Sequence, residues 1–174
     1  MGVTGSGKTT VGVRLAEELH GGFYDGDDYH PAANIEKMRR GTPLTDEDRG
    51  PWLDRLRGLI EEKLSAGENA VVACSALRDE YRKRLLPANP ELADDVLIVY
   101  LSISPEAARK RLLARQGHFM PATLVDSQFK TLEEPAGALR IDADGPVDEA
   151  VGLIKETLAR RPRGCPASPP PNQD

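Results

Sequence analysis

The sequence predicts an α/β fold of three layers, in which a mostly parallel sheet is flanked by helices. Short apolar runs alternate along the chain with longer stretches that have the apolar spacing of helices. The run at 96–101 is apolar without a break, as expected of a parallel strand that is covered on both faces. The chain has 174 residues, and we expect one domain at residues 1–160.

The first element is a glycine-rich loop that leads directly into a helix. Residues 2–9 read Gly-Val-Thr-Gly-Ser-Gly-Lys-Thr and match the phosphate-binding pattern G-x-x-x-x-G-K-[ST]. Glycine lets the backbone approach phosphates closely, and the N–H groups of the loop and helix point at them. A helix is expected over 8–19, because Val11, Leu15 and Leu19 recur at helical spacing. This P-loop NTPase pattern predicts a nucleoside triphosphate and Mg²⁺ as ligands.

Within the loop, Lys8 is expected to place its charge at the β- and γ-phosphates, and the Thr9 hydroxyl to bind Mg²⁺. The candidate ATP-binding residues of this segment are Gly2, Val3, Thr4, Gly5, Ser6, Gly7, Lys8, Thr9 and Thr10. Such a loop normally follows a buried β-strand, but only Met1 precedes it here. We therefore expect the first strand to be missing from this chain, leaving a slot in the sheet with unpaired backbone edges.

The next elements have clear start and stop signals. A short strand is expected at 22–25. Pro31 suits the first turn of a helix, and Gly41 suits the position after its end. Thr45 is expected to cap a helix that runs to about residue 66, since the acidic residues 46–48 favour its positive end.

The second half continues the alternation of strands and helices. Pro87 and Pro90 are expected to end a helix that passes through Tyr81 and Leu85. The other expected elements are strands at 70–74, 96–101 and 139–142, helices at 104–115, 121–132 and 147–159, and a loop at 116–120. Residues 161–174 are rich in proline and polar residues, and we expect a disordered tail there.

Composition excludes several classes of partner. The net charge of -5 argues against nucleic acid as the main partner. No apolar run approaches the roughly 20 residues of a membrane span. The chain has 2 cysteines, which excludes a disulfide framework and suits a reducing cytosol. Cys74 ends an apolar run and is expected to be a buried hydrophobe rather than a nucleophile.

Two carboxylates lie at the carboxyl end of the strand at 22–25, where open α/β sheets bind ligands. Of Asp25 and Asp27, one can orient Mg²⁺ or its waters, and the other can accept the proton of a substrate hydroxyl as it attacks the γ-phosphate. The alternative is an acidic turn in which Asp27 and Asp28 cap a helix. His30 follows closely and is a candidate for the substrate site.

Two more residues have both a functional and a structural interpretation. Arg49 can bind a substrate carboxylate through its planar guanidinium, or form a helix-surface ion pair with Glu47 or Asp48. Ser75 follows the strand at 70–74 and can bind substrate through its hydroxyl, or cap the next helix.

A basic cluster ends the helix at 104–115. It comprises Arg109, Lys110, Arg111 and Arg115. Its cations favour the negative end of a helix. They can also belong to a mobile lid that brings arginine onto the phosphates and excludes water, with His118 as a further member.

Longer motifs resemble one known family. They are DGDDYHP at 25–31, PLTDEDRGPWL at 43–53, CSALR at 74–78 and GHFMP at 117–121. Together with the phosphate loop they make the chain resemble the gluconokinases of the shikimate-kinase-like P-loop kinase group, over nearly all of residues 1–160.

The resemblance implies phosphorylation of D-gluconate by ATP to 6-phospho-D-gluconate, in a cytoplasmic enzyme that is often a homodimer. The composition, as above, argues against nucleic acid and a membrane as partners. By matching position it implies that Lys8 and Asp27 are catalytic, that Asp25 lies near Mg²⁺, and that Arg49 clamps the gluconate carboxylate. His30 and Ser75 stay candidates for the substrate site. Arg111 and Arg115 correspond to lid and nucleotide contacts.

Two rival classes remain. A shikimate kinase would be expected to have three consecutive glycines where this chain has Cys74, Ser75 and Ala76, and a nucleoside monophosphate kinase would need a base-binding region that we do not identify. The other class is an inactive, N-terminally truncated nucleotide-binding fragment. Retention of Lys8, Asp25 and Asp27 argues against lost catalysis.

Overall fold

The computed structural model describes residues 1–114 and 122–161. Its strands are β1 (Gly22–Asp25), β2 (Ala70–Ala73), β3 (Val99–Ser102) and β4 (Leu139–Asp142). Its helices are α1 (Lys8–Glu18), the short 3-10 helix η1 (Gly26–Tyr29), α2 (Ala32–Arg39), α3 (Asp46–Ser65), α4 (Asp79–Leu85), α5 (Pro90–Asp94), α6 (Pro105–Ala114), α7 (Ala122–Thr131) and α8 (Val147–Arg160).

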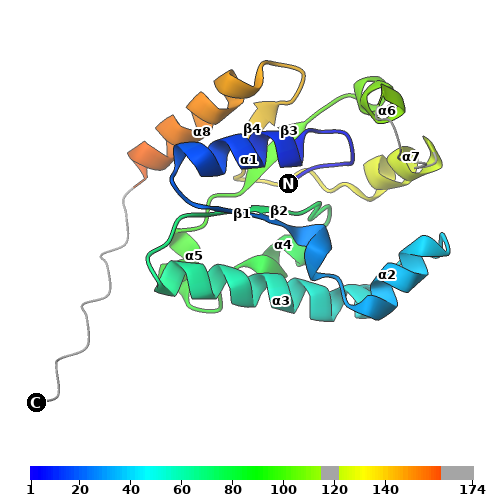
Figure 1. Ribbon diagram of the computed structural model, residues 1–174, viewed down its shortest axis with the longest axis horizontal. Coiled ribbons are helices and arrows are strands. Elements are labelled where there is room, and N and C mark those ends of the chain that lie inside the picture. The colour runs from blue at the N-terminus through cyan, green and yellow to red at the C-terminus, as the bar shows by residue number, and fades with distance from the viewer. Residues whose placement is uncertain (115–121, 162–174) are drawn as a thin grey trace, which may run out of the picture.

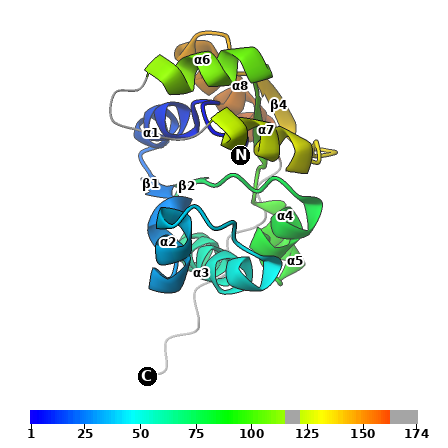
Figure 2. The ribbon, with the colours of Figure 1, turned by 90° about the vertical axis from the view of Figure 1, so that its right-hand side faces the viewer.

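The strands form two parallel pairs between layers of helices. β1 pairs with β2, with Gly22 opposite Ala70, and β3 pairs with β4, with Val99 opposite Leu139. In Figure 1, α1 lies on one side of the β1–β2 pair and α3 on the other, while α8 lies beside α1 and β4. Figure 2 shows α6 and α7 at the end of the molecule that also holds α1. The predicted three-layer α/β fold is confirmed.

The expected slot in the sheet is present between β2 and β3. Among the described residues these two strands do not pair with each other, and each belongs to a separate two-stranded sheet. Among the described residues, Met1 and Gly2 make backbone hydrogen bonds to both sides of this slot. The Met1 amine donates to the Val99 carbonyl at 2.5 Å, the Leu101 amide donates to the Met1 carbonyl at 3.0 Å, and the Gly2 amide donates to the Ser75 carbonyl at 3.2 Å.

Most of the start and stop signals are confirmed. The Thr45 hydroxyl accepts from the Asp48 amide at 3.3 Å, and the Asp48 carboxylate accepts from the Thr45 amide at 2.9 Å, which completes a capping box. Gly41 and Gly67 follow the ends of α2 and α3 with positive φ angles of 70° and 68°.

Two expected boundaries are wrong. The strand expected at 96–101 begins at Val99, because its pairing with β4 begins opposite Leu139; just before it, Arg161 donates to the carbonyls of Asp94 and Val96. Pro90 opens α5 instead of ending a helix. The Asn89 side chain caps α5 by accepting from the Glu91 amide at 3.0 Å, and the first position of a helix needs no N–H from proline.

Apolar side chains pack into three clusters. One joins α1, β3, β4 and α8 around Leu15, Leu101 and Ile154. A second joins α3 to the loop after β2 around Trp52, Leu53 and Leu56. The third packs α6 and α7 against the phosphate loop, and its members are Val3, Leu77, Ile103, Ala108, Leu112 and Val125. The third cluster holds the loop at the centre of the fold.

Some expectations fall outside the described residues. They are the loop at 116–120 with His118, the start of a helix at Pro121, the position of Arg115, and the tail beyond residue 161. Within the described part of the chain, no helix has both the length and the apolar character needed to span a bilayer.

Candidate active site

The phosphate loop is shaped by its glycines. Gly2, Gly5 and Gly7 have φ angles of 144°, 80° and 89°, which L side chains adopt at a cost. A Cβ on Gly5 would lie 2.9 Å from the Ala108 carbonyl oxygen, and a Cβ on Gly2 would lie 2.8 Å from that of Leu101. The loop therefore packs against β3 and α6 with no room for side chains at these two positions.

The end of the loop has the features of an anion site. Gly7 caps α1 without a side-chain hydrogen bond, so the backbone N–H groups of the first turn point outward. The Lys8 ammonium lies over the loop, where it donates to the carbonyls of Gly2 and Val3 at 3.0 Å each. Val3 and Ser6 are buried, so they offer only backbone groups, whereas Thr9 and Thr10 are exposed.

The Thr9 hydroxyl and the Asp25 carboxylate, which we predicted to lie near Mg²⁺, are in contact. Thr9 donates to Asp25 Oδ2 at 3.4 Å. Asp25 Oδ1 accepts from the Asp27 amide at 3.2 Å, so Asp25 is also the cap of η1. The capping interpretation of Asp27 is therefore wrong for η1, and the Asp27 carboxylate is exposed next to this pair.

His30 is buried behind Asp27 and belongs to a side-chain network. Its ring stacks on Trp52 with 4.2 Å between centroids, and its Nδ1 lies 3.4 Å from the Asn34 amide nitrogen. Asn34 also donates to the Asp48 carbonyl at 2.8 Å, which ties α2 to the start of α3. Burial lowers the pKa of His30, Asp27 raises it, and Arg49 lowers it.

Arg49 lies at the start of α3 in a cluster that sequence reasoning did not foresee. We call Asp46, Arg49, Arg78 and Tyr81 the arginine–tyrosine cluster. Asp46 accepts hydrogen bonds from the Tyr81 hydroxyl, from Arg78 at 3.0 Å and from Arg49 at 3.4 Å. The guanidinium carbons of Arg49 and Arg78 lie 5.5 Å and 5.7 Å from the centroid of the Tyr81 ring.

The cluster sets two guanidinium groups among carboxylates, because Arg78 pairs with Glu80 at 3.1 Å as well as with Asp46. The pKa of Asp46 is lowered first by its hydrogen bond from Tyr81 and then by the charges of Arg78 and Arg49. The pKa of Tyr81 is raised by burial and by its bond to Asp46. The two guanidinium groups are thus balanced by two carboxylates, those of Asp46 and Glu80. The expected surface pair of Arg49 with Glu47 or Asp48 is wrong, because its acidic partner is Asp46.

The loop after β2 brings Ser75 to the phosphate loop. Its carbonyl binds the Gly2 amide, and its side chain is half-buried. Ser75 does not cap the next helix, because α4 begins at Asp79 and has Arg78 in the capping position. Cys74 is a buried, free cysteine, and burial raises the pKa of its thiol to about 11, as expected of an unreactive thiol.

The basic residues of α6 do not act as one group. Arg111 donates to the Ala143 carbonyl at 2.6 Å and to the Gly5 carbonyl at 3.5 Å, so it lies against the phosphate loop. Arg109 forms an ion pair with Asp126 of α7 instead. Among the described basic residues of α6, Arg111 is therefore the one with a hydrogen bond to the phosphate loop.

Helix α7 and the residues after it contribute two contacts that sequence reasoning missed. Gln128 Oε1 accepts from the Thr4 amide at 2.6 Å. Glu133 donates from its amide to the Leu77 carbonyl at 2.8 Å, and its carboxylate accepts from the Asp79 amide at 2.7 Å. No local pattern signals these contacts, because they depend on how α7 packs.

The chain is similar in sequence to a family model and to known proteins. A family model described as an AAA domain matches residues 1–136. A probable gluconokinase of Xenopus tropicalis is 46% identical over 92% of this chain and 92% of its own length. The chain covers nearly the whole of that relative.

The chain is also similar to solved structures. The crystal structure of a gluconokinase from Sinorhizobium meliloti 1021 matches with a TM-score of 0.76 and 43% identity, over 92% of this chain and 89% of that one. A shikimate kinase from Aquifex aeolicus matches with a TM-score of 0.54 at 19% identity, covering 91% of this chain and 93% of that one. The second likeness concerns the fold alone.

Proposed function

The chain belongs to the gluconokinase family, and from this premise we propose that it transfers the γ-phosphoryl group of ATP to D-gluconate, giving 6-phospho-D-gluconate and ADP. The observation that carries the proposal is the arrangement of one site. The phosphate loop and the Thr9–Asp25 pair lie at one side of Asp27, and both Asp27 and Arg49 lie close enough to His30 to shift its pKa.

On the nucleotide side, the loop amides and the N-terminus of α1 bind the phosphates, and Lys8 and Arg111 add positive charge. Binding requires Lys8 to exchange its two carbonyl partners for phosphate oxygens. Mg²⁺ in such sites has one or two protein oxygens and completes its shell with phosphate and water. The hydroxyl of Thr9 and the carboxylate of Asp25 fit that donor set.

On the acceptor side, Asp27 acts as the general base. The gluconate 6-hydroxyl oxygen forms a bond to the γ-phosphorus, the bond from that phosphorus to the β–γ bridging oxygen breaks, and the hydroxyl proton passes to Asp27. Asp27 suits this role because its carboxylate is exposed beside the Thr9–Asp25 pair, while its backbone is fixed by Asp25.

Arg49 supplies specificity for a sugar acid. Arg49 is held by the Leu44 carbonyl at 2.6 Å and by Asp46, so its guanidinium is oriented before substrate arrives. A planar guanidinium recognises a carboxylate through two parallel hydrogen bonds. We assign Arg49 to the gluconate carboxylate, with His30 and Ser75 as further substrate contacts.

That 161–174 are a tail outside the domain rests on their proline-rich, polar composition. The remaining parts of the proposal rest on the family. They are that residues 1–160 form the kinase domain, that Arg115 contacts the nucleotide, and that the enzyme is a cytoplasmic homodimer. The last is checked by light scattering of the purified chain, for which a monomer mass would contradict it.

The test of function is ADP release by the purified chain with ATP and Mg²⁺ and one of four acceptors. The acceptors are D-gluconate, a sugar acid of different stereochemistry, shikimate and a nucleoside monophosphate. We expect release with gluconate that far exceeds release with the others. Release with shikimate or a nucleotide instead would reject the substrate, and silence with all four would favour an inactive nucleotide-binding fragment.

A further inference from the structure

The turn between β2 and α4 contains a residue in an unusual backbone conformation. Ala76 has a φ angle of 44°, in the left-handed region that favours glycine. Among the described residues, the other non-glycine residue with a positive φ angle is His20, which follows the end of α1, where this conformation is common. Ala76 follows a strand instead, because β2 ends at Ala73. The structure around Ala76 must therefore hold it in this conformation.

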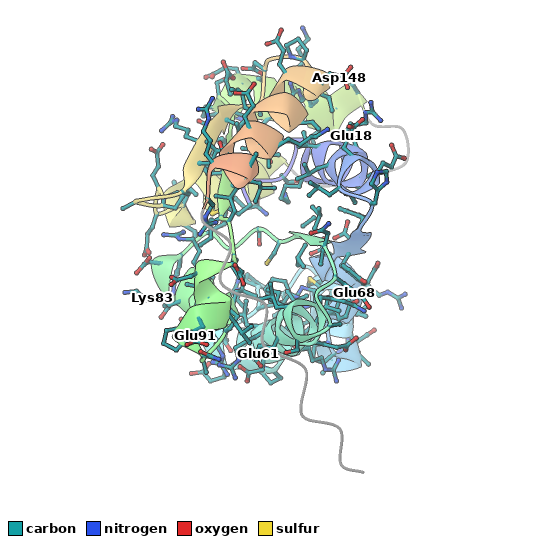
Figure 3. All side chains as sticks on the ribbon, turned by 90° about the vertical axis from the view of Figure 1, so that its left-hand side faces the viewer. Glu18, Glu61, Glu68, Lys83, Glu91 and Asp148 are labelled. Carbon is teal, nitrogen blue, oxygen red and sulfur yellow. The ribbon has the colours of Figure 1, made fainter. Side chains whose placement is uncertain are left out.

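The side chain that contacts this strained backbone belongs to Arg82. Arg82 is 5% exposed, whereas the next residue of α4, Lys83, is 75% exposed and lies at the outer surface of the molecule in Figure 3. One nitrogen of the Arg82 guanidinium donates to the carbonyls of Ala76 at 3.1 Å and Leu77 at 3.2 Å. Its carboxylate partner, Asp79, is 3.5 Å away and exposed. A cation is costly to bury, so these bonds to the turn are its main compensation.

Other segments hold the two ends of the same turn. The Ser75 carbonyl accepts from the Gly2 amide of the phosphate loop at 3.2 Å. The Leu77 carbonyl accepts from the Glu133 amide, just beyond α7, at 2.8 Å. The contact from Arg82 therefore lies at the middle of the turn, where the backbone is strained.

The turn separates two side chains that lie at the candidate acceptor site. Ser75 comes directly before Ala76 and is half-buried beside the phosphate loop. Arg78 follows two residues after Ala76, in the capping position of α4, and donates to Asp46 in the arginine–tyrosine cluster at 3.0 Å. A rotation of the backbone at Ala76 would move one side chain relative to the other. Their relative positions thus depend on the left-handed conformation.

We propose that Arg82 is a positioning residue for the acceptor. Its buried guanidinium holds Ala76 in the left-handed conformation, and this conformation sets where Ser75 and Arg78 lie. The described polar contacts of Arg82 are with the turn and with Asp79, so it acts on the acceptor through the turn. The inference rests on the proposed function, because that function places the acceptor beside Ser75 and the arginine–tyrosine cluster.

The experiment compares Arg82→Met with the matched control Arg84→Met in the full chain. Methionine keeps an unbranched, flexible side chain and removes the donors. Arg84 lies on the same helix and pairs with Asp54 of α3, so its variant shows the effect of losing a basic residue from α4. Arg82→Lys keeps a cation with a shorter reach, and it takes the place of Arg82→Met if that variant does not fold. ADP release gives KM for each substrate, and hydrogen exchange of the Glu133 amide reports on the turn without substrate.

We expect Arg82→Met to raise KM for gluconate by about 10-fold and KM for ATP by less than about 2-fold. Exchange of the Glu133 amide should become at least ~10-fold faster, because its acceptor lies in the turn. Arg84→Met should change none of the three quantities, and Arg82→Lys should change them in the same direction but by less. Equal rises in the two KM values, or unchanged exchange at Glu133, would overturn the proposal.

A second substitution separates positioning from general support of the fold. Ala76→Gly in the Arg82→Met background removes the cost of the left-handed conformation, so KM for gluconate should recover by about 3-fold or more although a buried methyl group is lost. Ala73→Gly also removes a buried methyl group, but from a strand, and should give no recovery. No recovery with Ala76→Gly, or equal recovery with both, would overturn the proposal.

Failure of the proposed function would look different from failure of this inference. If gluconate is not the acceptor, the original chain releases no ADP with it, and the exchange measurements alone decide. Faster exchange at Glu133 in Arg82→Met that Ala76→Gly reverses would then still support the role of Arg82 in the turn. Exchange that Arg82→Met leaves unchanged would overturn it.

Discussion

The phosphate loop and the arginine–tyrosine cluster, which we propose to serve the same reaction, are built differently. The loop is shaped by backbone angles and close packing within a few consecutive residues. The cluster joins side chains of α3 to Arg78 and Tyr81, about 30 positions further along the chain. The first depends on what the chain can adopt locally, and the second depends on how two helices pack.

This difference separates the effects expected from substitution. A change in the loop alters the backbone that binds phosphate, so it should affect ATP first. A change in the cluster removes one charged group from a prepared network, so it should affect the acceptor first. Asp27 lies between the two regions, and its loss should affect turnover more than the binding of either substrate.

The largest effect is expected at Asp27. Replacing it in Asp27→Asn removes the proton acceptor while keeping the size of the side chain, and kcat should fall by about 10²- to 10⁴-fold. The apparent affinity for ATP should change little. Steady-state ADP release measures both. Asp28→Asn is the matched control, because Asp28 is the exposed neighbour. Equal losses in the two variants would remove the base assignment.

Arg49→Ala should produce the next largest effect and separate the two regions most clearly. Loss of a charged pair to the substrate carboxylate should raise KM for gluconate by about 10- to 100-fold, with KM for ATP nearly unchanged. Arg57→Ala is the control, since Arg57 lies on the same helix and pairs with Asp54. A rise in KM for ATP of the same size would contradict the separation.

Two glycines of the loop allow a smaller, backbone-only comparison. Gly5→Ala and Gly7→Ala both place a side chain at positive φ, which costs roughly 1–2 kcal/mol. Gly5→Ala adds a clash with the Ala108 carbonyl at 2.9 Å, whereas the nearest neighbour of a Gly7 Cβ is 3.9 Å away. Calorimetric titration with ATP should show weaker binding for both, and clearly weaker binding for Gly5→Ala. The reverse order would mean that the contact with α6 does not shape the loop.

The smallest effect concerns pH. Burial lowers the pKa of His30 below its ordinary value of 6.5, so the unfolded chain takes up the proton first as pH falls. The free energy of unfolding should therefore decrease as pH is lowered through 6.5, and this contribution should level off below the folded-state pKa. His30→Phe keeps an aromatic ring against Trp52 and removes the titration. Denaturant unfolding at several pH values between 8 and 5.5 should show a shallower decline for the variant, and parallel curves would exclude His30 as the source.

What the sequence could predict follows the same difference between local motifs and the packing of distant segments. The phosphate loop, the capping box at Thr45 and the Thr9–Asp25 contact could be predicted because each depends on a short motif or on neighbouring strand ends. The roles of Arg78 and Tyr81 could not, because their partner Asp46 is identified only once α3 packs on α4. Local patterns also misplaced the start of β3, because it is set by the pairing of Val99 with Leu139, 40 positions further along the chain.

Helix α7 connects the two regions that this comparison separates. Gln128 binds the phosphate loop through Thr4, and Glu133, just beyond the helix, binds Leu77 and Asp79 beside Arg78. The phosphate loop and the cluster therefore both depend on where α7 lies. A displacement of α7 that increases the affinity for ATP also moves the residues beside Arg78 in the arginine–tyrosine cluster. Thermodynamic linkage then makes any such influence reciprocal, so that each substrate alters the affinity for the other by the same factor.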